Sequence, residues 1–145
     1  RLAAFCRNPG LSNGTVELPV PLRDVVRNGR RNDLTHLNHL RCRMGVYAFQ
    51  LRSCVIYVGK CTEATSKWHL RKRVSQHLTR ANAGGTLRIN WYRRHVSDFV
   101  AYAATLAQCS LWTISFPPGS DLQKIAQLEH LMIGLLGPAY CDVPP

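Results

Sequence analysis

The sequence predicts one small α/β fold of the α+β type, in which a three-stranded, mainly antiparallel sheet is flanked by about three helices in the order β-β-α-α-β-α. Two short apolar runs meet at a polar turn between residues 45 and 60, which predicts a hairpin. Two amphipathic stretches and an alternating run then lead to a strongly bounded helix. A length of 145 residues suffices for one ordinary domain. We therefore expect a single domain, 45–145, preceded by a basic N-terminal arm, 1–44.

The N-terminal arm carries few periodic signals. We expect a short helix over 22–27, stopped by Asn28-Gly29, and a second over 33–40, where several leucines share a face. From residue 23 onward the arm carries six arginines: Arg23, Arg27, Arg30, Arg31, Arg41 and Arg43. The arm could follow a phosphate backbone or pack on the domain as a solvated basic segment, and both interpretations stay open.

The predicted hairpin joins Gly45-Val46-Tyr47 to Tyr57-Val58-Gly59-Lys60. If Tyr47 pairs with Tyr57, both tyrosines share one face, because strand side chains alternate. That face also carries Phe49, Val55 and Gly59, and the core face carries Val46, Ala48, Cys54, Ile56 and Val58. This register requires an odd-length turn or a bulge near 51–53. The bare backbone of Gly59 leaves room for a close approach.

The first amphipathic helix is expected over 68–80. Its apolar stripe consists of Leu70, Val74 and Leu78, and a polar stripe of His69, Arg73, His77 and Arg80 borders it. Such a stripe would line the rim of a groove, although an ordinary amphipathic helix with a cationic side explains the same pattern.

A second helix is expected after Gly84-Gly85. Apolar residues recur at helical spacing (Tyr92, Val96, Phe99, Ala103 and Leu106), and Asn90 is a candidate N-cap. Arg88, Arg93 and Arg94 would stay outside as phosphate contacts. A third strand is expected over 111–116 because apolar and polar residues alternate there.

The last helix is bounded by a capping box at Ser120-Asp121-Leu122-Gln123 and by Gly137-Pro138. Its apolar side consists of Leu122, Ile125, Met132, Ile133 and Leu136, and Glu129 falls in the middle of it. A carboxylate in such a position is costly unless a cation satisfies it. Arg73 in a structural ion pair and a divalent metal are the two candidates.

The charge balance points to a polyanionic partner. Lysine and arginine number 19 against 8 acidic residues, which gives a net charge of +11. Nucleic acid is therefore the first candidate, and a merely solvated basic surface is the alternative. No apolar run approaches the roughly 18 residues of a membrane span. The six cysteines form no C-x-x-C pair, so we expect mostly buried, reduced thiols.

Taken together, these motifs resemble a GIY-YIG nuclease domain over residues 44–142. Gly45-Val46-Tyr47 and Tyr57-Val58-Gly59 stand for the two signatures, each with Val where Ile is usual. Residues 73–77, from Arg73 to His77, fit the arginine helix of the family, and Glu129 fits its metal-binding glutamate. The chain departs from the family by an insertion around 62–67 and by lacking the Asn that follows the last proline. Asp142 or Cys141 could occupy that place.

The resemblance implies a metal-dependent DNA endonuclease. Glu129 would hold Mg²⁺ or Mn²⁺, and Arg73 would stabilise the charge that develops on the scissile phosphate. Tyr47 would deprotonate or orient water with a pKa lowered by nearby cations. Tyr57 would orient phosphate or water, and Lys60 and His77 would assist proton movement. DNA contacts are expected from Arg88, Arg93, Arg94, Lys72 and Arg80. We expect an intracellular protein, in the cytoplasm, nucleoid or nucleus, that acts as a monomer or dimer.

Two other functions remain open. One is a catalytically inactive DNA-binding module on the same fold. The other is a small zinc-binding structural protein that uses residues such as Cys42, Cys54, His36 and His39. The nuclease interpretation requires the two tyrosines, Arg73 and Glu129 to converge on one pocket, although they lie far apart in the sequence.

Overall fold

The computed structural model describes residues 14–27, 31–80 and 85–141. The strands are β1 (Thr15–Val16), β2 (Val20–Pro21), β3 (Met44–Leu51), β4 (Cys54–Cys61) and β5 (Cys109–Phe116). The 3₁₀ helices are η1 (Leu22–Asp24) and η2 (Leu34–Leu40). The α-helices are α2 (Leu70–Leu78), α3 (Thr86–Arg94), α4 (Phe99–Ala107) and α5 (Leu122–Leu136). The α+β class is confirmed, and within the described residues no helix is long and apolar enough to cross a membrane.

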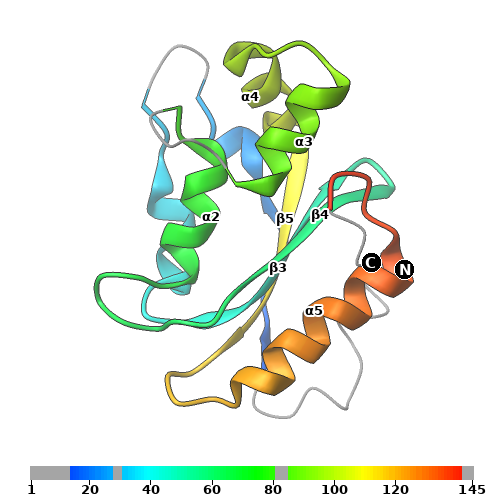
Figure 1. Cartoon of the computed structure of the whole chain (residues 1–145). Coiled ribbons are helices and arrows are strands. Elements are labelled where there is room, and N and C mark those ends of the chain that lie inside the picture. Colours follow the sequence, from blue (N-terminus) through cyan, green and yellow to red (C-terminus); the bar gives the residue numbers. More distant parts are fainter. Residues whose placement is uncertain (1–13, 28–30, 81–84, 142–145) are drawn as a thin grey trace.

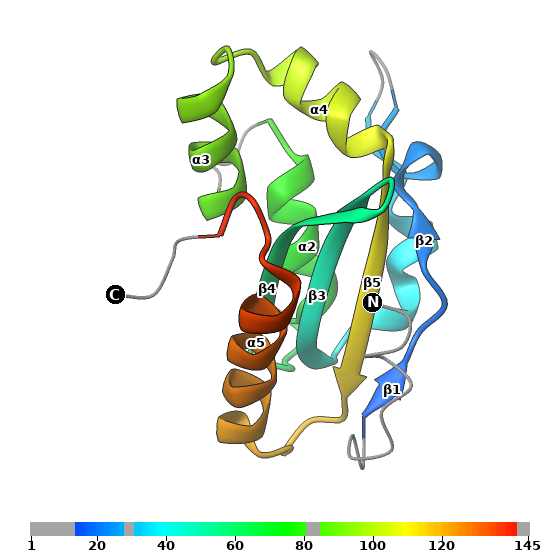
Figure 2. The ribbon, with the colours of Figure 1, turned by 90° about the vertical axis from the view of Figure 1, so that its right-hand side faces the viewer.

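The antiparallel sheet has the order β1-β5-β3-β4, and β2 also pairs with β5. The three predicted strands are therefore the core of the sheet, while β1 and β2 run one after the other along the outer edge of β5 (Figure 2). The prediction of three strands was too low. Each missed strand has only two residues, which is too short to show a sequence alternation.

The described residues of the predicted arm, 14–27 and 31–44, contribute to the hydrophobic core. Leu22, Val25, Leu37 and Leu40 are fully buried, and they pack in the same core as the residues of the hairpin. Described residues on both sides of the boundary at residue 44 thus share one hydrophobic core. The two expected short helices exist as η1 and η2, and the Asp33 side chain caps η2 by accepting from the Thr35 amide. Residues 1–13 and 28–30 of the predicted arm lie outside the described residues.

Helices cover both faces of the sheet (Figure 1). On one face α5 packs through Ile125, Leu128 and Met132 against a core that includes Val46 and Val58. The other face packs against η2, α2, α3 and α4, and its core includes both tyrosines of the hairpin. Because both faces are covered, the hairpin strands are almost entirely buried, unlike the one-sided surface for two phenols that the sequence suggested.

The hairpin register differs from the predicted one. Tyr47 pairs with Gly59, and Tyr57 pairs with Phe49. A bulge does occur, but the pairing shifts between Phe49 and Gln50, which leaves Ile56 as the extra residue, while the turn itself has two residues. The two tyrosines still share a face, as predicted, with ring centroids 6.2 Å apart.

The bulge exchanges the faces of two neighbouring residues. Val55 packs in the α5 core, and Ile56 packs in the tyrosine core, which is the reverse of the sequence-based assignment. The assignment was wrong because one extra residue inverts the alternation on its far side.

The predicted second helix is in fact two helices, α3 and α4. They are separated at residues 95–98, and the Asp98 side chain caps α4 by accepting from the Val100 amide. Val96, expected in the apolar stripe, is 62% exposed. Asn90 is not an N-cap, since it lies inside α3 and donates to the carbonyl of Tyr140. Because apolar residues continue at helical spacing across the break, the sequence analysis did not recognise Asp98 as the N-cap of a new helix.

The last helix was predicted well except for its cap. Asp121, rather than Ser120, is the N-cap, because its carboxylate accepts from the Gln123 amide. The Ser120 hydroxyl instead donates to the carbonyl of Pro117. Gly137 ends α5 in the left-handed conformation, as the C-terminal signal indicated. Leu122 is half exposed and does not belong to the buried side, whereas Leu128 does.

Candidate functional site

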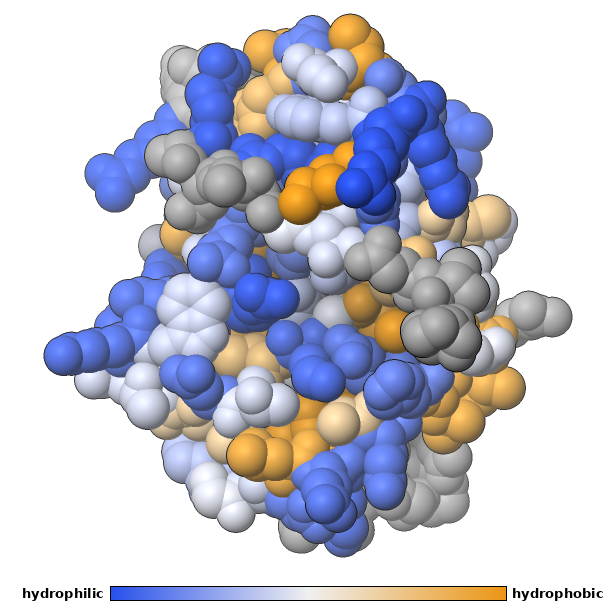
Figure 3. Space-filling view, viewed as in Figure 1, coloured by the Kyte–Doolittle hydropathy of each residue, from blue (hydrophilic) through white to orange (hydrophobic). Residues whose placement is uncertain are grey.

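A pocket of about 410 Å³ brings together residues that are distant in the sequence. Four of the predicted catalytic residues line it: Tyr57, Lys60, Arg73 and Glu129. The other lining residues are Gly59, Cys61, Thr62, Glu63, Trp68 and Thr86. The face of the molecule that carries α2 and α5 is rich in hydrophilic residues around its centre (Figure 3). The pocket therefore combines a phenol, an ammonium, a guanidinium and a carboxylate.

Glu129 pairs with Lys60 rather than with Arg73. The Lys60 Nζ lies 3.4 Å from Glu129 Oε1, and the two side chains are 36% and 16% exposed. The carboxylate is thus partly buried on the inner side of α5 but open to the pocket. Arg73 instead donates to the Gln76 side chain, so the alternative of an Arg73–Glu129 structural ion pair is not what the structure contains.

Tyr47 and His77 form a buried pair beneath the pocket. Their Oη and Nε2 atoms lie 2.6 Å apart, and both residues are almost inaccessible. A Cβ atom placed on Gly59, which lines the pocket, would lie 2.5 Å from the Tyr47 hydroxyl. Only a glycine backbone can pass over this phenol, so Gly59 forms the layer between Tyr47 and the pocket.

Burial, not cationic charge, dominates the pKa values of the phenols. Burial raises the pKa of Tyr47 well above its ordinary value, with Tyr57 raising it further and Arg73 opposing. Burial and then the nearby Cys141 raise the pKa of Tyr57 to about 12, against the opposing charge of Arg73. The expectation that neighbouring cations lower the pKa of Tyr47 is therefore wrong. Both phenols are protonated near neutral pH.

His77 is held neutral in the interior. Its pKa is lowered to about 3 by burial and, to a lesser extent, by the charges of Arg73 and Arg88. Within the described residues its Nδ1 atom has no hydrogen-bond partner. His77 therefore does not line the rim of a groove, and His69 is equally buried. The predicted polar stripe is therefore divided, because His69 and His77 lie in the core, Arg73 lines the pocket, and Arg80 is exposed beyond the end of α2.

The predicted DNA contacts differ in accessibility. Arg88 is only 4% exposed and donates to the carbonyls of Thr79 and Arg80, so its expected place on the surface was wrong. Arg88 instead ties α3 to the end of α2. Arg93, Arg94 and Lys72 are exposed and remain candidates. Arg80 is exposed as well, and its guanidinium lies 5.1 Å from the centre of the Phe99 ring.

The pocket offers oxygen ligands suited to a hard divalent cation. Glu129 and Glu63 both line it, together with the hydroxyls of Thr62, Thr86 and Tyr57. Within the described residues no three His, Cys, Asp or Glu side chains form a metal-ligand group. Magnesium fits this set, because it is commonly held by one or two carboxylates, substrate phosphate and water.

Sequence reasoning missed Glu63 and Thr86. Glu63 belongs to the insertion around 62–67, and Thr86 begins α3, so neither lies in a motif. No spacing rule links them to Glu129. The one local signal was proximity in the sequence, because Thr62 and Glu63 follow Gly59-Lys60 closely and could be expected near the same site.

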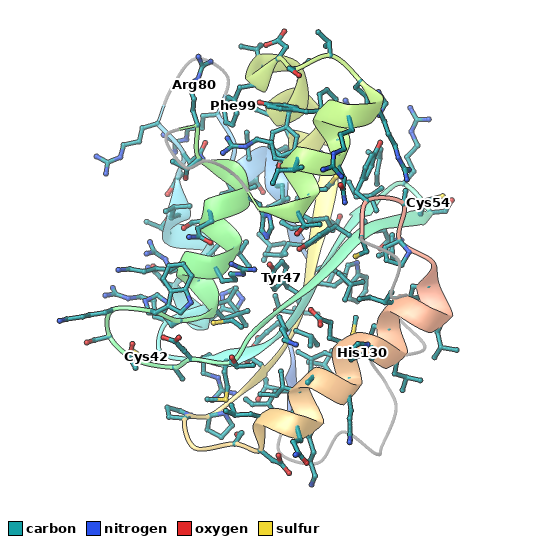
Figure 4. The ribbon with its side chains drawn as sticks, in the orientation of Figure 1. Cys42, Tyr47, Cys54, Arg80, Phe99 and His130 are labelled. Carbon is teal, nitrogen blue, oxygen red and sulfur yellow. The ribbon has the colours of Figure 1, made fainter. Side chains whose placement is uncertain are left out.

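The described cysteines do not form a cluster. Cys42, Cys54, Cys61 and Cys109 are free thiols, and Cys42 and Cys54 are exposed. Cys42 and Cys54, the cysteines of the zinc hypothesis, lie at opposite ends of the β3–β4 hairpin (Figure 4). Cys141 contacts the backbone of Val58 through its sulfur, and Asp142 lies outside the described residues.

Comparisons with protein-family models, with curated proteins and with solved structures found no match.

Proposed function

We propose that the protein is a metal-dependent DNA endonuclease of the GIY-YIG type, which hydrolyses phosphodiester bonds. The supporting observation is the pocket in which Tyr57, Lys60, Arg73 and Glu129 meet. These residues come from β4, α2 and α5, so folding alone brings them together. The net charge of +11 supports a polyanionic substrate.

Glu129 is the residue that would hold Mg²⁺ or Mn²⁺, and Glu63 is a second oxygen donor on the same pocket. A divalent cation there would neutralise charge on a non-bridging oxygen of the scissile phosphate. Lys60, which contacts Glu129 and lines the same pocket, is placed to pair with the substrate phosphate.

Arg73 and Tyr57 would act directly on the phosphate. The guanidinium presents a planar set of donors, which suits the equatorial oxygens of the transition state. The Tyr57 hydroxyl is protonated at neutral pH, so its direct role is to position the phosphate or the attacking water by hydrogen bonding. The water oxygen bonds to phosphorus, the bond to the leaving sugar oxygen breaks, and the proton of the water is transferred to that oxygen.

Tyr47 takes a different role from the one that the resemblance implies. Its hydroxyl is buried, is bonded to His77 and has a raised pKa, so in this conformation it contacts no water in the pocket. We propose that Tyr47 and His77 are positioning residues, which fix the backbone of Gly59 and the helix that carries Arg73. Tyr57 is then the phenol that meets the substrate.

The experiment is incubation of the protein with supercoiled plasmid and Mg²⁺, followed by the same reaction with EDTA. Nicking that requires the metal and disappears in Glu129→Gln supports the proposal. Intact DNA binding without nicking by the unaltered protein would contradict it. The Glu63→Gln variant removes the other carboxylate of the pocket and should reduce nicking less than Glu129→Gln does.

A non-catalytic DNA-binding module is the second candidate. It is favoured by the Lys60–Glu129 contact, which satisfies the carboxylate without a metal, and by the buried Tyr47. In that case Glu129→Gln would change neither plasmid integrity nor DNA affinity, and Mg²⁺ would leave the melting temperature unchanged.

A further inference from the structure

A second groove, of about 830 Å³, lies between the N-terminal segment, the end of α2 and one side of α4. Its apolar lining consists of Val26, Leu34, Leu78, Phe99, Val100, Ala103, Ala104 and Ala107. Its polar lining consists of Arg27, Arg31, Asn32, Thr79 and Arg80. None of these residues lines the candidate active-site pocket. The groove is therefore a separate feature that the proposed nuclease activity does not use.

The α4 helix is apolar on both of its sides. Its sequence, from Phe99 to Ala107, contains no charged residue. Tyr102 and Leu106 face the core, whereas Val100 is 56% exposed and Ala104 is exposed on the groove side. Figure 3 shows hydrophobic residues over α4 at the top of the view. Helices that are apolar all round are normally buried, so within the described residues this side of α4 lacks a cover.

Arginines line the polar part of the groove. Arg27, Arg31 and Arg80 carry three positive charges, and Asp33, which pairs with Arg27 at 2.8 Å, offsets one of them. The Arg80 side chain lies over the Phe99 ring at one end of the groove (Figure 4). An occupant must therefore combine an apolar surface with negative charge.

We propose that this groove binds an amphipathic acidic helix of a partner protein. Apolar side chains of that helix would pack on Val100, Ala103 and Ala107, whose small size lets another helix approach closely. Carboxylates along its flank would meet Arg31 and Arg80. The proposal does not depend on the nuclease activity, because no residue of the active-site pocket takes part.

Other occupants fit the groove less well. Single-stranded nucleic acid needs open aromatic faces for base stacking, yet the Phe99 ring already has the guanidinium groups of Arg80 and Arg88 within 5.1 and 5.5 Å of its centre. The remaining apolar lining is aliphatic, unlike the polar surfaces that bind DNA. A second copy of this chain fits less well because its net charge of +11 would repel the arginines of the groove. Residues 1–13 fit less well because they contain Arg1 and Arg7 and no acidic residue that could pair with those arginines.

The test uses three fluorescent helical peptides of about 18 residues, a length at which an isolated helix can form. The first has a leucine stripe and glutamates on its flanks, the second replaces the glutamates by lysines, and the third permutes the first so that the stripe is lost. We expect the acidic amphipathic peptide to bind about tenfold or more tightly than either control, as measured by fluorescence anisotropy. Equal binding of all three, or no binding of the first, would overturn the proposal.

Variants locate the binding on the protein. Val100→Glu and Arg31→Glu should each weaken binding of the acidic peptide about tenfold, because the first adds a charge to the apolar floor and the second reverses a rim charge. The matched control for Arg31→Glu is Lys124→Glu, which makes the same change of charge at an exposed position of α5. Thermal unfolding checks that each variant is folded. If Lys124→Glu weakens binding as much as Arg31→Glu, the contact is non-specific and the proposal fails.

Two further measurements separate the remaining occupants. If duplex DNA displaces the acidic peptide, and Val100→Glu weakens DNA binding, the groove binds nucleic acid. Stronger peptide binding after deletion of residues 1–13, or a dimer that Val100→Glu dissociates in sedimentation, would assign it to this chain itself. Each of these results contradicts the proposed partner helix.

Discussion

The hydroxyl of Tyr47 lies 2.6 Å from Nε2 of His77, and this hydrogen bond is closed off from solvent by the backbone of Gly59. Both residues were expected at the surface of an active site, and both instead lie inside the core. Their burial decides which experiments can distinguish a structural from a chemical role.

The first prediction concerns pH and stability. Since folding lowers the pKa of His77 from 6.5 to about 3, the unfolded chain binds a proton below pH 6.5 that the native state excludes. The stabilising effect is complete above the unfolded pKa and is lost as the pH falls toward 3. We expect the free energy of unfolding to drop by about 2 kcal/mol between pH 7 and pH 5, measured by urea denaturation. His69, whose pKa is also lowered, adds in the same direction. The slope should flatten in His77→Gln; an unchanged slope would show that His77 is not buried neutral.

The second prediction separates the two tyrosines. Tyr47→Phe removes the partner of a buried imidazole and should cost about 1–3 kcal/mol of stability. Tyr57→Phe removes the hydroxyl of a residue that lines the pocket and should lower the cleavage rate with little effect on the melting temperature. Plasmid cleavage and thermal unfolding of both variants check this division. The reverse pattern, a stable but inactive Tyr47→Phe, would restore Tyr47 as the reacting phenol.

The third prediction concerns the carboxylate. Glu129→Gln should abolish cleavage and leave DNA affinity largely unchanged, because the phosphate contacts remain while the metal ligand is removed. Glu63→Gln should reduce cleavage less and raise the Mg²⁺ concentration at half-maximal rate. Titration of cleavage with Mg²⁺ measures both effects. Equal, complete inactivation by the two changes would mean that both carboxylates hold the metal.

The fourth prediction concerns the arginines of α3. Arg93→Ala and Arg94→Ala together should weaken DNA binding and lower the slope of log affinity against log salt by about 2, because two phosphates are no longer neutralised. Arg88→Ala should instead destabilise the fold by about 1–3 kcal/mol, because the carbonyls of Thr79 and Arg80 lose their donor. Salt-dependent anisotropy and denaturation separate the two outcomes. An unchanged salt slope in the double variant would make Arg93 and Arg94 a merely solvated surface.

The fifth prediction tests the thin layer over Tyr47. Gly59→Ala places a methyl group against the Tyr47 ring and hydroxyl, and the expected cost is about 1–3 kcal/mol. In the double variant Gly59→Ala with Tyr47→Phe, removal of the hydroxyl should recover part of that cost. Thermal unfolding of the single and double variants measures the coupling. Strictly additive effects would argue against the close approach.

The sequence predicted the elements with strong periodicity and failed where one residue or one contact decided the outcome. The three main strands, α2, α5 and the Gly137 cap follow from alternation, helical spacing and terminal signals. The bulge at Ile56 was predicted at the wrong position, and the helix break before Asp98 was not predicted. Neither changes the average alternation or helical spacing of apolar residues around it.

The site followed the same division. The convergence of Tyr47, Tyr57, Arg73 and Glu129 was predicted from motif order, and the structure brings Tyr57, Arg73 and Glu129 to one pocket with Lys60. Tyr47 does not line that pocket, because it is buried. The depth of each side chain was not predictable, because burial depends on elements that pack from elsewhere. Thus Arg88 and His77, polar by type, were expected outside and lie inside.

The pairing of β1 and β2 with β5 has a practical consequence for any shortened form of this protein. A fragment that begins at the first signature, near residue 44, would present the bare backbone of β5 to other molecules and uncover the surface against which Leu22 and Leu37 pack. Unpaired strand edges recruit one another into aggregates. The smallest soluble unit that retains the pocket should therefore start before Thr15, well upstream of Gly45-Val46-Tyr47.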